Sequence, residues 1–286
     1  VELILKEAEL ASTLGIAASY VENIPLPIDI KAAVRFDAQA KFHPRKFLLA
    51  LAETAQESGC NIYEQTRVVD MEYADNKYYL KADNGRKITA DRVIIASHYP
   101  FYNKAALYFT RLYPMRSYVV GVKANEAYPG GMYISAEDPI RSIRSQSTDN
   151  GEMILIGGEH HKTGQGEDTS LHYEALANFA KEHFGTEDML YRWSAQDCMS
   201  VDDVPLAGRY TSDTENLYVL TGFGKWGMSN SMASAMLIED LITGNDNAWC
   251  DVYNPSRHTI LASAKDFILE NTNVAKEFIK GKLEDT

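Results

Sequence analysis

The stretch Gly222-Phe223-Gly224-Lys225-Trp226-Gly227 decides the fold, because its glycine spacing is G-x-G-x-x-G and both of its flanks have a regular pattern. The apolar run 217–220 before it predicts a strand, and the small-residue pattern over 228–242 after it predicts a helix. Strand, glycine turn and helix form the context of a dinucleotide-binding fingerprint. The glycines let the backbone approach a ligand closely, and the N-terminus of the helix favours an anion.

The chain departs from that fingerprint after the helix. A first βαβ unit also needs a second strand that ends in an acidic residue, about 20 residues after the glycines. Glu239 and Asp240 lie near that distance, but both fall inside the same helical pattern. Residues 245–250 carry no buried-strand pattern. A pyrophosphate-binding role is therefore not favoured, and the glycine turn needs another explanation.

Composition narrows the class of protein and its partners. The 286 residues suffice for one large or two ordinary domains, and contents of 45% hydrophobic and 24% charged residues are typical of a soluble globular protein. The net charge of −12 argues against nucleic acid and anionic membrane as partners. No apolar run reaches the length of about 20 residues that a membrane span needs. Cys60, Cys198 and Cys250 are far apart, which suits a reducing compartment, so we expect a cytoplasmic protein without a Cys-x-x-Cys metal site.

Hydrophobic periodicity predicts a mixed α/β fold. Helical patterns cover residues 1–18, 45–58 and 170–185, and the residues from Pro255 onward are also predicted to be helical. Strand patterns at 61–64, 68–73, 77–82 and 87–89 lead to the β-branched run 93–96, which is typical of a strand covered on both faces. Further strands between 107 and 160 predict a largely antiparallel sheet. Asp202-Asp203 is predicted to be a solvated loop.

Several segments resemble a known flavoprotein family. The run 93–97 after a β-meander resembles the second cofactor strand of glutathione-reductase-type flavoproteins, and 222–228 resembles their closing flavin motif. Order and spacing resemble the D-amino-acid-oxidase-like family (glycine and sarcosine oxidases), within it a bacterial branch fused to a C-terminal Rieske iron–sulfur domain. Besides 222–228, the segments that carry this resemblance are Phe42-His43-Pro44, His98-Tyr99-Pro100-Phe101, Gly130-Gly131-Met132-Tyr133-Ile134-Ser135, the run 157–164 and the run 191–197.

The resemblance implies a partial FAD domain of the glutathione-reductase type with an inserted, largely antiparallel β-sheet substrate domain. The implied limits are 36–100 and 203–245 for the FAD-binding domain, 101–202 for the substrate domain, 1–35 for a helical lead-in to it, and 246–286 for a C-terminal helical linker. The family's N-terminal G-x-G-x-x-G unit and the Rieske ligands are absent from the sequence, so we expect a fragment of a longer protein. The implied cofactor is FAD, although whether the fragment holds it alone is left open, and a [2Fe–2S] cluster would lie only in a Rieske domain outside the chain.

The resemblance also implies cofactor-binding residues. The turn would face the pyrimidine edge of the flavin, where negative charge gathers on reduction and a helix N-terminus contributes about 0.3–1 kcal/mol. Val68 and Val69 would contact the adenine through their backbone, Ala96 and Ser97 would close over the ADP part, and His98 ends the same strand. A strand–helix turn that uses glycine only for its geometry is the alternative. The candidate residues of the turn are Gly222, Phe223, Gly224, Lys225, Trp226, Gly227 and Met228.

Candidate catalytic residues follow from the resemblance as well. Asp197 lies where amino-acid-oxidising relatives carry an arginine for the substrate carboxylate, so an amine or another cation becomes a candidate substrate. Arg144 or Arg141 offers a compensating positive charge, but strand alternation lets only one of them face the flavin. Tyr133 is a candidate pocket aromatic and His43 a candidate at the start of a helix, with a structural role as the alternative for each. His160-His161 is not expected to bind a metal, because adjacent strand residues point to opposite faces.

Taken together, these features favour an FAD-dependent oxidoreductase. It would oxidise a small amine or amino-acid-type substrate by hydride transfer to the flavin, and a Rieske domain in the same protein would receive the electrons. Two alternatives stay open. One is an NAD(P)-dependent dehydrogenase, which takes the glycine spacing at face value, and the other is a cofactor-free interaction module.

Overall fold

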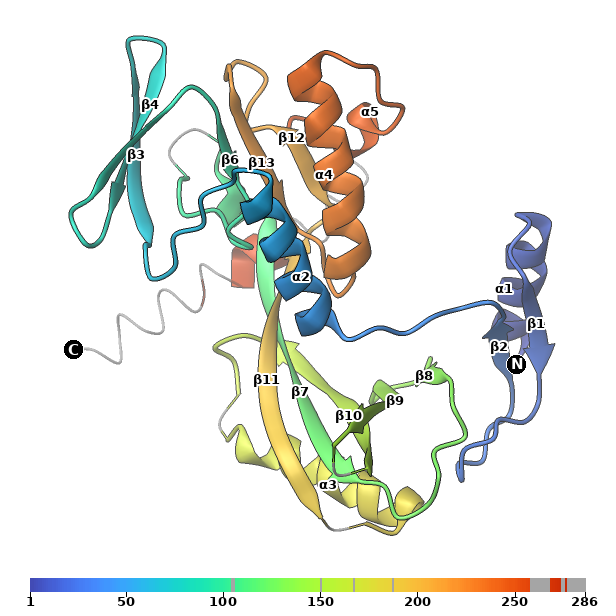
Figure 1. Ribbon diagram of the computed structural model, residues 1–286. Helices are drawn as coiled ribbons and strands as arrows, with labels where there is room; N and C mark the ends of the chain where they lie inside the picture. The colour runs from blue at the N-terminus through green and yellow to red at the C-terminus, as the bar shows by residue number, and fades with distance from the viewer. Residues whose placement is uncertain are drawn as a thin grey trace. The chain divides into compact units, whose positions relative to one another are not determined.

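The computed structural model describes residues 1–103, 106–149, 151–166, 168–186, 188–257, 268–273 and 276 (Figure 1). The chain forms two compact units. The first contains residues 1–51 and 116–195, and the second contains residues 52–115 and 196–286. These limits differ from the domain boundaries expected from the sequence, which stay predictions.

The first unit is built around a five-stranded sheet whose order is β11-β7-β10-β9-β8. One face packs against α3 (Ser170–Phe184) and buries Tyr118, Val120, Ile156 and Leu176. Helix α3 was predicted at 170–185, and it ends at Gly185, whose φ of +62° suits glycine. The strands are β7 (Leu112–Lys123), β8 (Met132–Ile134), β9 (Arg141–Thr148), β10 (Gly151–Lys162) and β11 (Met189–Ser200).

The N-terminal part of this unit is less helical than the sequence predicts. Helix α1 covers only Glu2–Thr13, and β1 (Ala18–Val21) then pairs antiparallel with β2 (Ala33–Phe36). The prediction of a helical lead-in over 1–35 was therefore wrong after residue 13. Pairing between strands that are not adjacent in sequence is a long-range property, and four-residue strands carry too little periodicity to reveal it. Helix α2 (Pro44–Glu57) leads from the first unit into the second.

The second unit contains the predicted meander and a small sheet whose strand β13 leads directly into the glycine turn. The antiparallel meander consists of β3 (Val68–Ala74), β4 (Lys77–Ala82) and β5 (Lys87–Ala90). The other sheet has the order β12-β13-β6, in which β13 (Leu217–Thr221) runs parallel to β6 (Val93–Ile95) and antiparallel to β12 (Leu206–Arg209). No strand forms at 61–64, contrary to the prediction.

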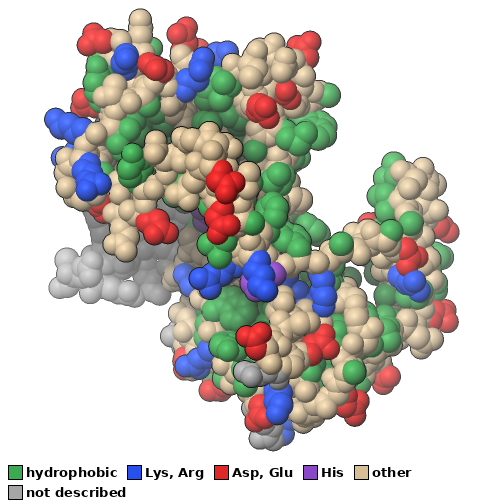
Figure 2. Space-filling view, viewed as in Figure 1, with side chains coloured by type: hydrophobic (Ala, Val, Ile, Leu, Met, Phe, Trp, Pro, Cys, Tyr) green, Lys and Arg blue, Asp and Glu red, His purple; other side chains and the backbone are tan. Residues whose placement is uncertain are grey.

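Strand β6 is not covered on both faces. Val93 and Ile95 are buried, whereas Ile94 between them is 45% exposed. In the order β12-β13-β6 it is an edge strand, so the continuous β-branched run overstates its burial in this chain. Exposed apolar side chains lie among charged ones elsewhere on the surface as well (Figure 2).

Helix α4 (Gly227–Thr243) packs Leu237 and Ile238 against Tyr218 of β13. The chain then forms α5 (Cys250–Tyr253), and Cys250 and Tyr253 join the same cluster. Residues 255–257 form a turn, so a helix does not begin at Pro255. The remainder of the predicted C-terminal helix lies largely outside the described residues, although 268–273 are helical.

Candidate cofactor and substrate site

The glycine turn lies between β13 and α4 of the second unit. Gly222 and Gly224 have φ values of +69° and +56°, a conformation that favours glycine. A Cβ on Gly222 would lie 3.2 Å from Leu112 Cδ2 and 3.3 Å from Ser200 Cβ, so the turn also fits tightly against its neighbours. Backbone geometry therefore favours glycine at both positions, and at Gly222 the lack of space favours it as well.

The third glycine separates this turn from the dinucleotide fingerprint. In that fingerprint the last glycine allows the helix to pack closely on the strand. A Cβ on Gly227 would meet no atom within 4 Å, so no close packing depends on it here. This open space argues against the nicotinamide-cofactor interpretation and leaves room for a ligand at the start of α4.

The N-terminus of α4 is suited to a negatively charged group. Trp226 is the N-cap residue, and it is 73% exposed and provides no side-chain cap. The first N–H groups of a helix have no intrahelical partner and carry a partial positive charge. Backbone donors, open space and glycine geometry therefore converge at one place, and they fit the electron-rich edge of a flavin.

Hydrogen bonds connect the turn to two other segments of the second unit. The Gly224 N–H donates to the carbonyl of Cys198 on β11 at 2.9 Å. The Thr221 hydroxyl donates to the carbonyl of His98 at 2.5 Å, and His98 itself has a φ of +64°. Burial raises the pKa of the Cys198 thiol, so it stays protonated as part of the packing.

The other candidate cofactor residues lie on two different elements. Ala96, Ser97 and His98 form the exposed loop after β6, and Ser97 Oγ donates to the Tyr99 carbonyl at 2.9 Å. Val68 and Val69 begin β3 in the meander, where Val69 is 45% exposed. The structure thus joins His98 to the glycine turn, while the roles of all five residues toward a cofactor stay predictions.

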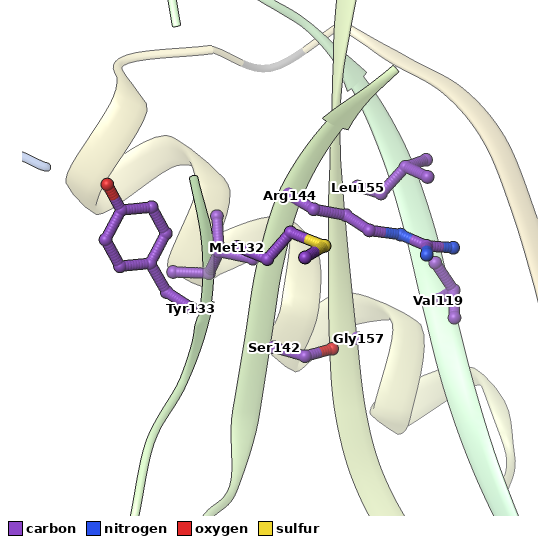
Figure 3. Close-up of a pocket in the computed structure, with 8 residues that line it drawn as sticks. Val119, Met132, Tyr133, Ser142, Arg144, Leu155 and Gly157 are labelled. Atoms are coloured by element: carbon purple, nitrogen blue, oxygen red, sulfur yellow. The ribbon is translucent and has the colours of Figure 1, made fainter. Parts of the chain in front are cut away.

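A pocket of about 180 Å³ lies in the first unit, on the sheet face opposite α3 (Figure 3). Its only charged lining residue is Arg144, an exposed residue whose side chain extends over β10 toward Leu155 and Val119. Gly157 leaves space for the pocket because it has no side chain. A Cβ added to it would lie 2.7 Å from Ser142 Oγ. The lining residues are Val119, Met132, Tyr133, Ser142, Ile143, Arg144, Leu155 and Gly157.

Tyr133 lines this pocket, but its hydroxyl is engaged elsewhere. Its ring is directed away from Arg144 (Figure 3), and its Oη donates to the Gly130 carbonyl at 3.0 Å. Burial raises the pKa of Tyr133, so the phenol stays neutral. Tyr133 therefore shapes the wall of the pocket, and a chemical role for its hydroxyl stays a prediction.

The two arginines of β9 lie on opposite faces of the strand, as alternation requires. Arg144 lines the pocket, whereas Arg141 is buried and forms an ion pair with Glu159. His172 Nδ1 also donates to Glu159, at 3.1 Å. Burial alone would raise the pKa of the Glu159 carboxyl, but the hydrogen bond from His172 and the charge of Arg141 hold the pKa below its ordinary value. Arg144 is thus the arginine available to a ligand.

His43 and Asp197 lie in different units. His43 precedes α2, and its Nδ1 accepts the backbone N–H of Lys46 at 3.4 Å, which is a helix-capping position. Asp197 is half-buried on β11 in the second unit, next to Cys198.

In the first unit, Lys41 Nζ donates to Ser145 Oγ at 2.8 Å, which places a second cation at the β9 residue that follows Arg144.

Sequence reasoning missed one strongly bonded pair. Asp202, predicted to be solvated, receives two hydrogen bonds from Arg257, and the two side chains are only 11% and 7% exposed. The partners are 55 residues apart, and no local pattern connects them.

Among the described residues, no cluster of three or more His, Cys, Asp or Glu is arranged to hold a metal ion. In the same part of the chain, no helix has the length and apolar character needed to cross a bilayer.

The comparisons with known proteins concern the family and the fold of the chain. The family model described as DAO, FAD dependent oxidoreductase, matches residues 2–241, so the chain belongs to this family of FAD-dependent enzymes. The mixed α/β fold with antiparallel sheets predicted from the sequence is confirmed. Glycine oxidase from Geobacillus kaustophilus superposes with a TM-score of 0.72 at 19% identity, covering 88% of this chain and 70% of that one. Glycine oxidase from Bacillus cereus ATCC 14579 gives 0.73 at 21% identity, covering 90% and 72%.

Relatives at the sequence level are longer than this chain. The chain is 37% identical over 284 residues to YhfW of Bacillus subtilis (strain 168), whose name marks it as a candidate Rieske 2Fe-2S iron–sulfur protein. This match covers 99% of the chain and 56% of YhfW. A D-amino acid dehydrogenase of Rhizobium rhizogenes (strain K84 / ATCC BAA-868) is 25% identical over 214 residues, which are 70% of the chain and 48% of that protein. The chain thus spans about half the length of these curated relatives.

Proposed function

We propose that this chain supplies the flavin-ring end and the substrate face of an oxidoreductase that oxidises a small amine or amino-acid-type substrate. The uncapped N-terminus of α4, beside glycines that leave its backbone accessible, is the observation that carries the proposal. Bound FAD would supply the hydride-accepting ring. The part of the chain is to orient that ring and to stabilise the charge that develops on it.

The residues of the turn divide this work. Backbone N–H groups near Gly227 and Met228 would hold the electron-rich edge of the ring, and the partial charge of the helix N-terminus favours the reduced form. Exposed Trp226 and Lys225 and half-buried Phe223 would border the ring. Val68, Val69 and the loop 96–98 would contact the adenine and ADP portions through their backbone.

We propose that the pocket lined by Arg144, on the sheet face opposite α3, recognises the substrate. Arg144 forms no ion pair with a carboxylate among the described residues, so an anionic group of the substrate can pair with it. Tyr133 would form part of the pocket wall, and His43 would cap the start of α2. Asp197 would favour a cationic amine, in keeping with the aspartate that replaces the family's carboxylate-binding arginine.

The longer protein is proposed to pass its electrons to a Rieske [2Fe–2S] domain after the chain described here. The name of YhfW and its 37% identity over nearly the whole chain support this step. The domain limits 1–35, 36–100, 101–202, 203–245 and 246–286 belong to the same proposal. So does a cytoplasmic location, which the three unpaired cysteines suit.

An FAD titration of the full-length protein tests the role of the turn. We expect Gly224→Ala to weaken FAD binding at least tenfold, because a side chain at a φ of +56° strains the turn that is proposed to hold the ring. Gly244→Ala is the matched control: Gly244 ends α4 with a φ of +80°, and its Cβ would meet nothing within 4 Å. Equal effects of the two variants on FAD affinity would show that the turn does not contact the cofactor.

A further inference from the structure

Within the second unit, the buried side chain of Arg257 holds the segment after α5 against the loop 202–205. Arg257 donates to both carboxylate oxygens of Asp202, at 2.8 and 2.7 Å. The same guanidinium donates to the carbonyls of Val204 at 2.6 Å and Pro205 at 2.8 Å. Residues 202–205 belong to no helix or strand, so their backbone conformation depends strongly on this one side chain.

The residues at both ends of the loop held by Arg257 lie against the glycine turn. Ser200 precedes the loop and Leu206 follows it, and a Cβ on Gly222 would lie 3.3 Å from Ser200 Cβ and 3.7 Å from Leu206 N. A displacement of the loop by a few tenths of an ångström would therefore change the space available to Gly222. The Gly224 N–H depends on the same region, since its acceptor is the Cys198 carbonyl two residues before Ser200.

A second arginine attaches the neighbouring backbone to the same segment. The Arg111 carbonyl accepts the N–H of Val201 at 3.0 Å, and the Arg111 guanidinium donates to the carbonyl of Pro255. Pro255 is buried, and its Cδ would lie 2.8 Å from a Cβ on Gly208. Residues 255–257 thus contact the loop and Gly208 after it, and Arg111 connects Pro255 to Val201 before it.

We infer that Arg257 is a positioning residue for the glycine turn, which it acts on through Asp202 and the loop 202–205. The segment after α5 is then part of the architecture of the turn, and it is more than a connection between α5 and the later residues. The identity of the ligand at the turn rests on the proposed function. The positioning itself does not, because every contact involved lies within the protein.

Amide hydrogen exchange of the full-length protein, measured without added FAD, tests this inference. We expect Arg257→Gln to speed exchange of the Gly224 amide at least tenfold, while amides of β10 in the first unit keep their wild-type rates. Arg209→Gln, at an exposed position on β12, is the control and should leave Gly224 unchanged. An unaltered Gly224 rate in Arg257→Gln would overturn the inference.

A conservative variant separates positioning from general loss of folding. Arg257→Lys keeps the charge but cannot bridge both carboxylate oxygens and two carbonyls at once. If Arg257→Gln loosens the whole second unit, the lysine variant decides: selective loss of Gly224 protection upholds the inference, and unchanged protection overturns it. FAD titration is read separately, because a wild-type protein that binds no FAD would refute the proposed function and leave the exchange result standing.

Discussion

At the residue scale, Arg144 is the side chain whose removal should affect ligand binding without affecting folding. It is exposed, lines the pocket, and forms no ion pair among the described residues. We expect Arg144→Gln to raise KM for an anionic substrate about tenfold, because one charge-assisted contact is worth roughly 1.5 kcal/mol. Steady-state kinetics and urea unfolding measure the two effects. Lys123→Gln, an exposed charge at the end of β7, is the control, and a matching rise in KM there would count against a specific site.

Glu159 should make the stability of the first unit depend on pH. Its pKa is held below the ordinary value of 4.5, so the stabilisation is fully present above that pH and is lost as pH falls through the lower folded-state pKa. We expect Glu159→Gln to reduce the unfolding free energy by roughly 1–3 kcal/mol at neutral pH, and the difference from wild type to shrink below pH 4.5. Denaturant titrations across pH would show this. Glu182→Gln, exposed on α3, should be nearly neutral, and a pH-independent loss in Glu159→Gln would contradict the assignment.

At the element scale, α3 should derive its stability from the face that it packs on the sheet. Leu176 is fully buried in that interface, whereas Leu171 on the same helix is 58% exposed. We expect Leu176→Ala to lower the free energy of unfolding by about 2–5 kcal/mol, because it leaves a cavity in a packed core. Leu171→Ala should change it by less than about 0.5 kcal/mol. Similar losses in thermal or urea unfolding would mean that α3 is not packed in this register.

The elements that the sequence predicted well are those with many local contacts. Helix α3 and the meander of β3, β4 and β5 follow from periodicity and short turns. The pairing of β1 with β2, the exposure of Ile94 and the bond between Asp202 and Arg257 were missed. Each depends on which distant segment lies alongside, and neither propensity nor spacing contains that information. For the candidate site, the glycine turn was recognisable, but the choice between Arg141 and Arg144 needed the strand register.

At the scale of the whole molecule, the chain belongs to a family of FAD-dependent oxidoreductases, and we propose that its glycine turn contacts the flavin ring. In the second unit, β6 is an edge strand that leaves Ile94 45% exposed. The pocket lined by Arg144 lies in the first unit and the glycine turn in the second, so each proposed role can be tested by a variant in its own unit.

The absorption spectrum of the full-length protein after reconstitution with FAD tests the central claim most directly. We expect a yellow flavin band that stays with the protein through gel filtration and bleaches when a suitable amine or amino acid is added anaerobically. A protein that retains no flavin band, or one that instead binds a nicotinamide cofactor, would contradict the assignment of the glycine turn to the flavin.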